Sequence, residues 1–511
     1  MNGISTPKTF LPVIGLEVHV QLKTKTKMFC DCSVEFGVEP NKNICPVCTG
    51  QPGVLPVVNK KAIELAIKTA LALNCKIHNE SIFARKNYYY PDLPKNYQIT
   101  QYEQPIATDG YVEVELKENN EYKKVFIKRV HIEEDAGKLL HAIGKEELGY
   151  SLVDYNRAGT PLLEIVSQPC LYSVEEAISY LVALRDILRF IEVSDCDLEK
   201  GTFRVDANVS ITKLNDNFDG DYNKLKLGTK TEIKNMNSFK AIKEALTYEI
   251  ERQKEILLSN NKIVQETRLW DENLGITKSM RTKEEAHDYR YFPEPDLLPL
   301  EIETSWIEEL KKSLPELPLQ KKKRFKKTFN LPDYDINILV SEKTISEYFE
   351  KTMAVYIKNY ELKNSDLTNV AKTVSNLIIT EILGLLNQEG LSFEENKIKE
   401  EYLAEAVKLY NDKILSSKLL KEILHEVWET KKSPKEIVQQ KGLSQISDVE
   451  QLKEIVREVI LQNPNIVADY KSGKFQAISA LMGQVMKKTK GKADPVKAQQ
   501  ILKEMLNEKD F

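Results

Sequence analysis

The sequence lacks the short motifs that identify most nucleotide-binding and hydrolytic enzymes. It contains no G-x-x-x-x-G-K-[ST] loop, no G-x-G-x-x-G after a strand and no G-x-S-x-G turn, which argues against a P-loop, a Rossmann fold and an elbow-type serine hydrolase. A Gly/Ser-rich stretch with a lysine and paired serines, of the kind that releases ammonia from glutamine, is also missing. Any ATP must therefore be held by acidic side chains on strands together with a metal ion.

Long hydrophobic runs and a strong net charge are missing as well. No apolar run is long enough to cross a bilayer and the N-terminus has no secretory signal, so we expect a cytoplasmic protein with no membrane partner. The net charge is only −4, so any RNA contact must come from local basic patches. The 511 residues, 41% apolar and 29% charged, are typical of a globular protein with roughly two to four domains.

The seven cysteines are unevenly distributed. Four of them form the paired motifs Cys30-x-Cys32 and Cys45-x-x-Cys48. Such pairs bring four thiolates into one tetrahedral shell, which suits Zn²⁺, and a site with no open position would brace a loop without catalysing a reaction. A redox C-x-x-C is the alternative, although no thioredoxin-like βαβ pattern surrounds it. We expect Cys75, Cys170 and Cys196 to take no part.

Two strand-like segments place acidic side chains on one face. In 13–21, the apolar residues alternate onto one face and leave Glu17 and His19 together on the other, about 6–7 Å apart along the strand. In 125–134, alternation puts Phe126, Val130, Ile132 and Glu134 on one face.

A third such segment follows in 161–166, where Glu164 shares a face with Leu162 and Val166. Carboxylates seldom lie on an apolar face unless they are paired or bind a cation. The alternative for each is a side chain that reaches solvent at a strand end, but two cases close together favour a site.

Several further segments have two interpretations each. The loop 85–99, with basic, amide and phenolic groups, can hold an anion and a nucleobase or simply cover the core. The strands expected in 202–210 and 229–235 have one polar face, which fits either a wide polar concavity or a solvated outer surface. Prolines 293, 295 and 299 mark a boundary, after which the pattern is helical, with a charged run at 321–327 typical of a solvated helix face.

The motifs together resemble one family over essentially the whole chain and in the right order. They read GLEVHVQL, the two cysteine pairs, RKNYYYPDLPKNYQI, HIEEDAGK, LVDYNRAGTPLLEIVS, TEIKNMNSF, QETR, DYRYFPEPD and GQVMKKTKGKADP. This set is similar to the B subunit of the bacterial tRNA-dependent amidotransferase, the GatB family. One departure is Asn330, which stands where relatives have glycine in a turn; Asn tolerates a positive φ.

The resemblance implies an α+β fold. A cradle-shaped, glutamine-synthetase-like kinase domain with a mixed or antiparallel sheet (1–295, with a zinc knuckle at 30–48) would be followed by an all-α helical domain (296–410) and an all-α YqeY-like tail (411–511). The implied activity is ATP-dependent phosphorylation of the side-chain carboxylate of Glu on tRNA(Gln) or Asp on tRNA(Asn). Ammonia from the amidase partner, called the A subunit, then attacks the acyl phosphate. A small C subunit would complete a heterotrimer, with the misacylating aminoacyl-tRNA synthetase as a further partner.

Family positions carried onto this sequence give the expected site residues. The magnesium ligands would be His19, Glu134 and Glu164, which with Lys86 make the catalytic set. Residues expected to contact ATP or the acyl phosphate are Glu17, Arg85, Arg204, Glu232, Arg268 and Arg290. Lys86 and Arg85 would serve as phosphate or tunnel-gate groups. The expected tRNA contacts are Lys471, Lys474, Lys487, Lys488, Lys490 and Lys492, because lysines gathered in one segment neutralise phosphates.

Two other functions fit parts of the pattern. One is a zinc-containing tRNA-binding protein without catalysis, whose acidic residues are structural; ATPase activity with misacylated tRNA separates it from the enzyme. The other is a free-standing ligase that uses ammonia directly; glutamine-dependent turnover without any partner would identify it.

Overall fold

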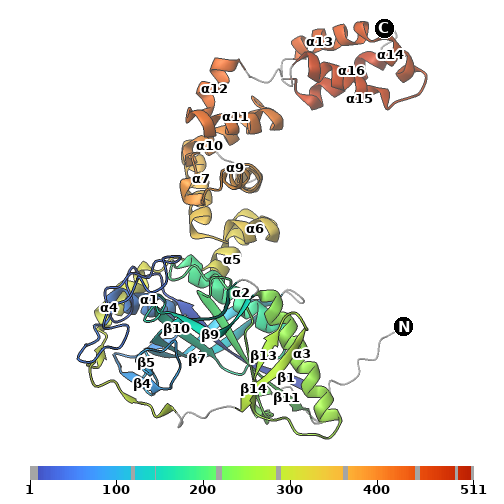
Figure 1. Ribbon diagram of the computed structural model, residues 1–511. Helices are drawn as coiled ribbons and strands as arrows, with labels where there is room; N and C mark the ends of the chain where they lie inside the picture. The colour runs from blue at the N-terminus through green and yellow to red at the C-terminus, as the bar shows by residue number, and fades with distance from the viewer. Residues whose placement is uncertain are drawn as a thin grey trace. The chain divides into compact units, whose positions relative to one another are not determined.

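A mixed nine-stranded sheet is the largest element of the computed structural model, which describes residues 10–116, 121–143, 146–214, 221–282, 289–360, 366–442, 449–489 and 493–507 (Figure 1). All neighbouring strands pair antiparallel except β12 and β13. Across the sheet, the strands are β14 (Ile276–Thr282), β13 (Glu266–Asp271), β12 (Thr231–Lys234), β11 (Phe203–Lys213), β1 (Phe10–Gln21), β10 (Pro161–Ser167), β7 (Glu121–Glu134), β6 (Ala107–Leu116) and β2 (Lys76–Ile77).

Among the residues that the structure describes, the helices that contact this sheet pack on one of its faces. Apolar residues of β1, such as Leu16 and Val18, pack in one core with residues of three helices. These helices are α1 (Lys60–Ala72), α2 (Val174–Phe190) and α3 (Phe239–Leu258), and a fourth, α4 (Thr304–Ser313), packs on α1. Asn59 caps α1 and Ser173 caps α2 through side-chain oxygens that accept backbone N–H groups, as N-cap residues do. The opposite face carries Glu17 and His19, so the alternation predicted for the first strand is confirmed.

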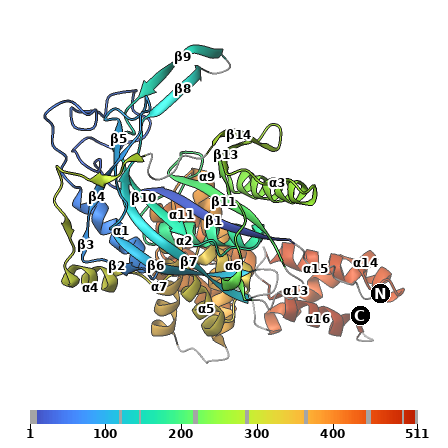
Figure 2. The ribbon, with the colours of Figure 1, turned by 90° about the horizontal axis from the view of Figure 1, so that it is seen from below.

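Smaller sheets flank the large one. One consists of β15 (Phe292–Pro293), β4 (Phe83–Asn87) and β5 (Tyr97–Gln101), so the expected loop 85–99 begins and ends in strands. The others are the pair β16 (Leu300–Glu301) and β3 (Glu80–Ser81), and the hairpin of β8 (Lys138–Ile143) and β9 (Glu146–Asp154), which extends away from the large sheet (Figure 2).

A register irregularity in β7 corrects one sequence-based expectation. Along β10, Val166 pairs with Arg129 while its neighbour Ser167 pairs with Ile127, so Lys128 is an extra residue on β7. A bulge of this kind reverses which residues face the core. Val125 and Ile127 are buried before the bulge, and Val130 and Ile132 after it, whereas Phe126 is 51% exposed. Phe126 therefore does not share a face with Val130, Ile132 and Glu134.

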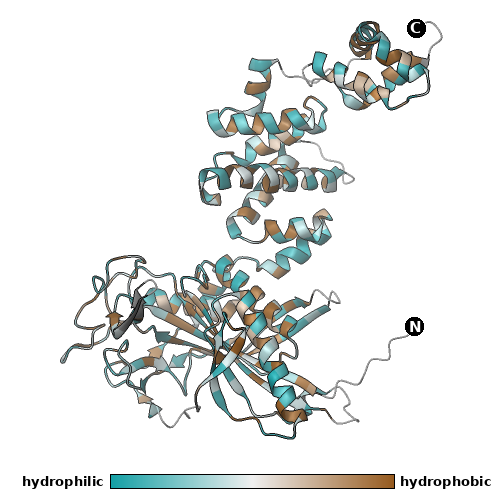
Figure 3. Cartoon of the chain, turned by 45° about the vertical axis from the view of Figure 1, so that its right-hand side comes forward, coloured by the Kyte–Doolittle hydropathy of each residue, from teal (hydrophilic) through white to brown (hydrophobic). Residues whose placement is uncertain are grey.

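The second compact unit, from Gln320 onward, is helical. Hydrophobic residues recur along its helices between hydrophilic ones (Figure 3) and form two cores, one from Phe325 to Val438 and one from Leu452 to Leu506. The helices of the first core are α5 (Pro318–Phe329), α6 (Asp333–Leu339), α7 (Lys343–Asn359), α8 (Leu367–Leu377), the π-helix η4 (Ile378–Ile382), α9 (Leu383–Glu389), α10 (Glu400–Asn411), α11 (Ser417–Thr430) and α12 (Pro434–Lys441). The second core has α13 (Val449–Gln462), α14 (Pro464–Lys471), α15 (Ala477–Lys488) and α16 (Pro495–Asn507).

The α+β class with a large mixed sheet and an all-α C-terminal part is thus confirmed, but the packing divides the chain later than expected. The first compact unit runs to Leu319 and its core includes Ile302 and Leu310, beyond the boundary expected at 295. The seam expected at 410 falls inside the second core, because α10, α11 and α12 pack together. Asn330 has a φ of +49°, so the turn that it was expected to preserve is present.

One helical segment is long and apolar enough to span a membrane, by length and composition alone. It comprises α8, η4 and α9 (367–389), and 56% of its most apolar stretch of 18 residues is buried inside the protein. This segment contacts α7, α10 and α11 in the core of the helical unit, which accounts for its apolar character. Lys372 and Glu381 interrupt the segment, and a buried core helix passes the same test of length and composition, so the segment is no clear membrane span.

Candidate catalytic site

The polar face of the large sheet gathers histidines and carboxylates at its centre. In the pairing of β1, β10 and β7, His19 lies opposite Glu164, and Glu164 lies opposite His131. Residues directly opposite in an antiparallel pair share a face. Glu133 follows His131 by two residues and so joins the same row. The sheet therefore brings two imidazoles and two carboxylates together from three strands.

The distances within this row are short and its members are largely buried. His19 Nε2 lies 3.4 Å from a Glu164 oxygen and 3.6 Å from a Glu133 oxygen. His131 Nε2 lies 3.1 Å from the same Glu164 oxygen. Glu133 is 3% exposed and Glu164 8%. Ligand atoms of His19, Glu133 and Glu164 all lie within 4.8 Å of one another, so this trio could hold a metal ion.

The charges of the row act on one another. Burial alone would lower the pKa of His19, but the hydrogen bond to Glu164 and the charges of Glu164, Glu133 and Asp206 raise it to about 9. Burial would raise the pKa of Glu164, but His131 and His19 hold it well below its usual range. Glu164 is thus anionic and supplies a hard oxygen donor, which divalent cations such as Mg²⁺ prefer.

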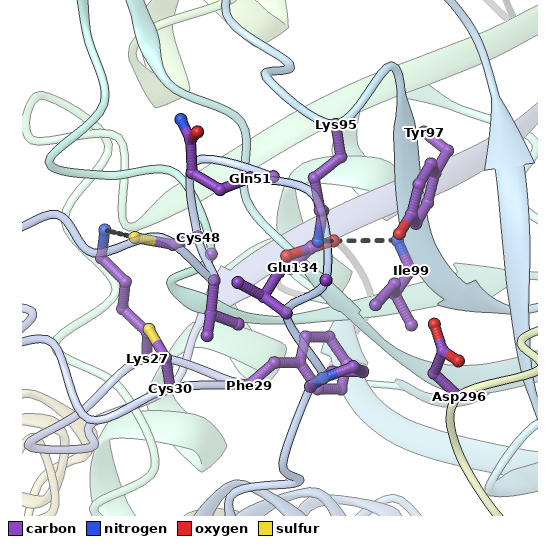
Figure 4. Close-up of a pocket in the computed structure, with 16 residues that line it drawn as sticks. Lys27, Phe29, Cys30, Cys48, Gln51, Lys95, Tyr97, Ile99, Glu134 and Asp296 are labelled. Atoms are coloured by element: carbon purple, nitrogen blue, oxygen red, sulfur yellow. Dashed lines mark hydrogen bonds and ion pairs between the residues drawn. The ribbon is translucent and has the colours of Figure 1, made fainter.

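Glu134, expected as a metal ligand, does not join this row. It follows Ile132 on the core-facing side of β7, where it forms an ion pair with Lys95 and accepts a hydrogen bond of 3.0 Å from the Ile99 N–H. Figure 4 shows Lys95 and Glu134 meeting in a separate cavity of about 200 Å³ (Figure 4). The correction follows from strand alternation, because neighbouring residues point to opposite faces. Glu133 takes the place that the sequence analysis gave to Glu134.

A larger cavity of about 1430 Å³ opens over the polar face. His19, Glu133, Lys86, Arg204 and Lys234 are among the residues that line it. Burial would lower the pKa of Lys86, but Tyr291, Glu133 and Glu164 raise it above its ordinary value, so its ammonium is charged beside the carboxylates. The cavity therefore combines acids that can hold a cation with bases that can contact phosphate.

Arg204 and Asp206 extend the polar row across β11. Arg204, opposite His19 in the sheet, donates to Asp135 at 2.9 Å. Asp206, opposite Glu17, forms an ion pair with Lys234.

Glu17 and Glu232 continue the same face. The Asn208 amide donates to Glu17 at 2.9 Å, and burial, followed by the charges of Glu164, Glu232 and Asp206, raises the pKa of Glu17. The Thr267 hydroxyl donates to Glu232 at 2.9 Å, and Lys234 lies 3.4 Å from it. The concavity, and not the solvated outer face, is the correct interpretation of these polar strands.

Three of the expected arginines have other roles. Arg85 donates to both carboxylate oxygens of Glu294 at 2.7 and 2.8 Å, and lies on the opposite side of β4 from Lys86. Arg268 points to the helical side of the sheet, where it lies 3.7 Å from Glu249 of α3. Arg290 is exposed and does not line the large cavity. None of the three faces the carboxylate row.

Sequence reasoning did not name Glu133, His131, Lys95 or Asp135 as site residues, and it placed Asp206 and Lys234 only on the polar faces of their strands. The segment His131-Ile132-Glu133 contained a usable signal, since a histidine and a glutamate two residues apart share a strand face. Choosing Glu133 over Glu134 requires the register of β7 to β10, which the sequence does not reveal.

The four cysteines expected to act together do lie together. Ligand atoms of Cys30, Cys32, Cys45 and Cys48 are all within 4.8 Å of one another, and the sulfurs of Cys45 and Cys48 are 3.9 Å apart. Two sulfurs at ~2.3 Å from a tetrahedral metal ion stand about 3.8 Å apart, so the cluster fits a metal ion.

Lys27 supports this cluster from inside the protein. It is fully buried and donates to Cys48 Sγ at 3.5 Å and to the Tyr155 carbonyl at 3.2 Å. The hydrogen bond with Cys30, the Cys45 N–H and the charge of Lys27 lower the pKa of Cys48 to about 4 against the effect of burial. A thiolate is the form that binds metal.

Four of the six lysines expected to bind tRNA lie in the described residues, and Lys490 and Lys492 lie outside them. Lys471 is at the end of α14, Lys474 follows it, and Lys487 and Lys488 end α15. Lys474 pairs with Asp469 at 2.9 Å, and Lys488 pairs with Glu458. Part of this basic charge is therefore balanced within the tail.

Comparison with known proteins agrees with this architecture. Residues 12–308 match the model of the GatB/GatE catalytic domain, and residues 359–506 match that of the GatB domain. The chain belongs to the GatB family. It is 51% identical over 497 residues to the B subunit of the aspartyl/glutamyl-tRNA(Asn/Gln) amidotransferase of Persephonella marina, covering 97% of this chain and 99% of the relative. The B subunits of the same name from Thermoanaerobacter pseudethanolicus and Caldicellulosiruptor bescii are each 50% identical, over 97% of this chain and 99% and 98% of their own lengths.

The corrected ligand set makes a direct prediction about this GatB-family protein. Glu133→Gln should weaken Mn²⁺ binding at least about tenfold, the scale on which even outer partners of a metal change its affinity. Glu134→Gln, the matched control on the other face of β7, should leave it unchanged. Electron paramagnetic resonance titration of free Mn²⁺ measures both, and stronger weakening by Glu134→Gln would favour Glu134 as the ligand.

Proposed function

We propose that this chain is the catalytic B subunit of a glutamine-dependent tRNA amidotransferase, a ligase of protein biosynthesis. Misacylated Glu-tRNA(Gln), Asp-tRNA(Asn) or both are the substrates, and Gln-tRNA(Gln) and Asn-tRNA(Asn) are the products. The observation that carries the proposal is the row of His19, Glu133 and Glu164, whose His19 and Glu133 line a cavity together with Lys86, Arg204 and Lys234. A purely RNA-binding protein needs no such row, so the non-catalytic alternative is not favoured.

The proposed reaction has two steps. The side-chain carboxylate of the misacylated residue attacks the γ-phosphorus of ATP, which gives an acyl phosphate and ADP. Ammonia then attacks the acyl carbon, phosphate leaves, and an amide remains. The first step brings a carboxylate and a polyphosphate together, and in the second negative charge builds on the carbonyl oxygen and the departing phosphate, so both transition states are stabilised mainly by positioning and opposite charge. Mg²⁺ bound by His19, Glu133 and Glu164 would neutralise the phosphate oxygens.

The residues of this chain supply the remaining positive charge. Lys86 lies beside Glu133 and Glu164 and can donate to oxygens of the transferred phosphoryl group. Arg204 is held in place by Asp135, and Lys234 by Asp206 and Glu232. A lysine or arginine fixed by a carboxylate loses little further conformational freedom when an anion arrives.

The wide polar sheet with acids and bases on one face also supports a cradle-shaped, glutamine-synthetase-like kinase domain. ATP would lie along the polar face, in accordance with the absence of a glycine-rich phosphate loop from the sequence. Ammonia would come from the amidase A subunit, with a small C subunit completing the heterotrimer and the misacylating synthetase delivering the tRNA. With these partners and a tRNA substrate, the proposed location is the cytoplasm.

Glu164→Gln tests the proposed function. In the reconstituted complex it should lower kcat for ATP-dependent amidation of misacylated tRNA by about 10²–10³-fold, the effect of removing one preorganised electrostatic contact. Glutamine hydrolysis should be retained, since it belongs to the amidase partner. Assaying Glu-tRNA(Gln) and Asp-tRNA(Asn) in parallel identifies the substrate. Near-normal amidation by the variant at low magnesium would refute the metal assignment.

The four-cysteine cluster is proposed to bind Zn²⁺ and to brace the loop of residues 30–48. Elemental analysis of protein purified without chelator should find roughly one zinc per chain, as a four-ligand site requires. Cys45→Ser should lose it and make the loop sensitive to protease, because structural zinc contributes to local folding. Cys170→Ser, at a cysteine far from the cluster in sequence, should keep it. Native protein without zinc would contradict the proposal.

The tail formed by α13–α16 is proposed to hold the tRNA body without taking part in the chemistry. It has its own hydrophobic core, so a chain ending at residue 442 should leave the rest folded. Its deletion should raise the KM for misacylated tRNA about tenfold or more, because lost phosphate contacts weaken RNA binding steeply at physiological salt. Glutamine hydrolysis without tRNA is the control. Equal tRNA affinity with and without the tail would disprove this role.

A further inference from the structure

Two aromatic rings lie against the ammonium of Lys86. Its Nζ lies 5.1 Å from the centroid of the Tyr289 ring and 5.7 Å from that of Tyr88. The two rings meet edge to face at 6.2 Å, and Tyr289 contacts Tyr291 in the same way at 6.0 Å. Tyr291 stacks in turn on Tyr102, with centroids 4.1 Å apart. The rings thus form a continuous cluster that joins the region of β4 and β5 to a segment much later in the chain.

This later segment, residues 289–296, is termed the tyrosine strap. Its backbone is fixed to β4, since the Asn87 amide donates to the carbonyls of Tyr289 and Arg290 at 3.2 and 2.9 Å. Phe292 of β15 pairs with Arg85 in register. Arg85 also holds both oxygens of Glu294 and lies 3.2 Å from Asp296. A bidentate arginine–carboxylate pair fixes direction as well as distance.

We propose that the tyrosine strap is a positioning element for Lys86, whose ammonium the rings of Tyr289 and Tyr88 hold at the carboxylate row and ready for a phosphoryl oxygen. The inference deepens the proposed function and rests on it. It also gives Arg85 a role in place of the phosphate contact expected from the sequence. Arg85 anchors the strap through Glu294, and Lys86, its neighbour on the other side of β4, contacts the Tyr289 ring of the strap.

The chemistry of lysine shows why rings suit this position. Lysine is a flexible chain with a compact charge and three donors. Without the rings, the Lys86 ammonium would form ion pairs with Glu133 and Glu164. It would then occupy carboxylate oxygens that a metal ion needs. An aromatic face attracts a cation through its quadrupole without accepting a conventional hydrogen bond. The rings can therefore hold the charge near the carboxylates while its donors stay available to substrate oxygens.

Substitutions at Tyr289 separate the ring from the hydroxyl. Tyr289→Leu should lower kcat for amidation by about 3–30-fold, the range of a desolvated cation–π contact, with little change in KM for tRNA or in glutamine hydrolysis. Tyr289→Phe keeps the ring and should behave as wild type. Tyr334→Leu, at a 70% exposed tyrosine of α6, controls for the loss of a tyrosine as such. If Tyr289→Phe were as impaired as Tyr289→Leu, the hydroxyl and not the ring would matter and the proposal would be overturned.

Chemical labelling gives a readout that does not depend on the reaction. Limiting acetic anhydride, with mass spectrometry of the Lys86 peptide, should modify Lys86 faster in the Tyr289→Leu complex than in wild type or Tyr289→Phe. Loss of amidation with unchanged labelling would overturn the proposal, as would wild-type rates in both assays. If the wild-type complex failed to amidate tRNA, the proposed function would fall, but labelling would still decide whether the rings hold Lys86.

Discussion

The catalytic face depends on the antiparallel register of β1, β10 and β7. Because residues directly opposite one another share a face, this register sets His19, Glu164 and His131 side by side and adds Glu133 from the next position on β7. A shift of one residue in either pairing would turn the carboxylates toward the apolar core. The helices α1, α2 and α3 pack on the apolar side chains of the same strands, so the packing of the core keeps the site in register.

Charge is the second constraint on this face, because carboxylates so close together repel. Part of the repulsion shows in Glu17, whose pKa is raised by burial and then by Glu164, Glu232 and Asp206. Groups of opposite sign lie beside the others: His19, whose pKa is raised, pairs with Glu164, Lys234 lies between Asp206 and Glu232, and Arg204 pairs with Asp135. Nearly every charge named here has a partner of opposite sign, yet none of these pairs closes the cavity above. A divalent cation and a polyphosphate have opposite charges, so the two can bind together in this cavity.

Residue alternation predicted which side chains share a face within a regular strand. It did not predict features that depend on how strands pair with one another. Alternation along 13–21 correctly placed Glu17 and His19 on the polar face, because β1 is regular. The same reasoning failed in 125–134, since the bulge at Lys128 changes the phase of β7 and the register to β10 selects Glu133 over Glu134.

Motif spacing gathered the four cysteines correctly, because they lie in one short loop. Arg85 and Arg268 were misplaced for the opposite reason. Their partners, Glu294 and Glu249, come from distant segments, and an arginine that forms an ion pair at one face of a strand looks in the sequence like one that faces a ligand.

The division of labour between Arg85 and Lys86 also limits how this part of the chain can evolve. Arg85 and Lys86 point to opposite sides of β4, so the position of each residue along the strand decides which of the two roles it can take. A substitution in β4 changes one side chain and leaves the orientation of the others unchanged. The loss or gain of a single residue in this strand would instead exchange the anchor and the amine in one step. Insertions and deletions in β4 would therefore disrupt both roles at once, whereas single substitutions in this strand change one side chain at a time.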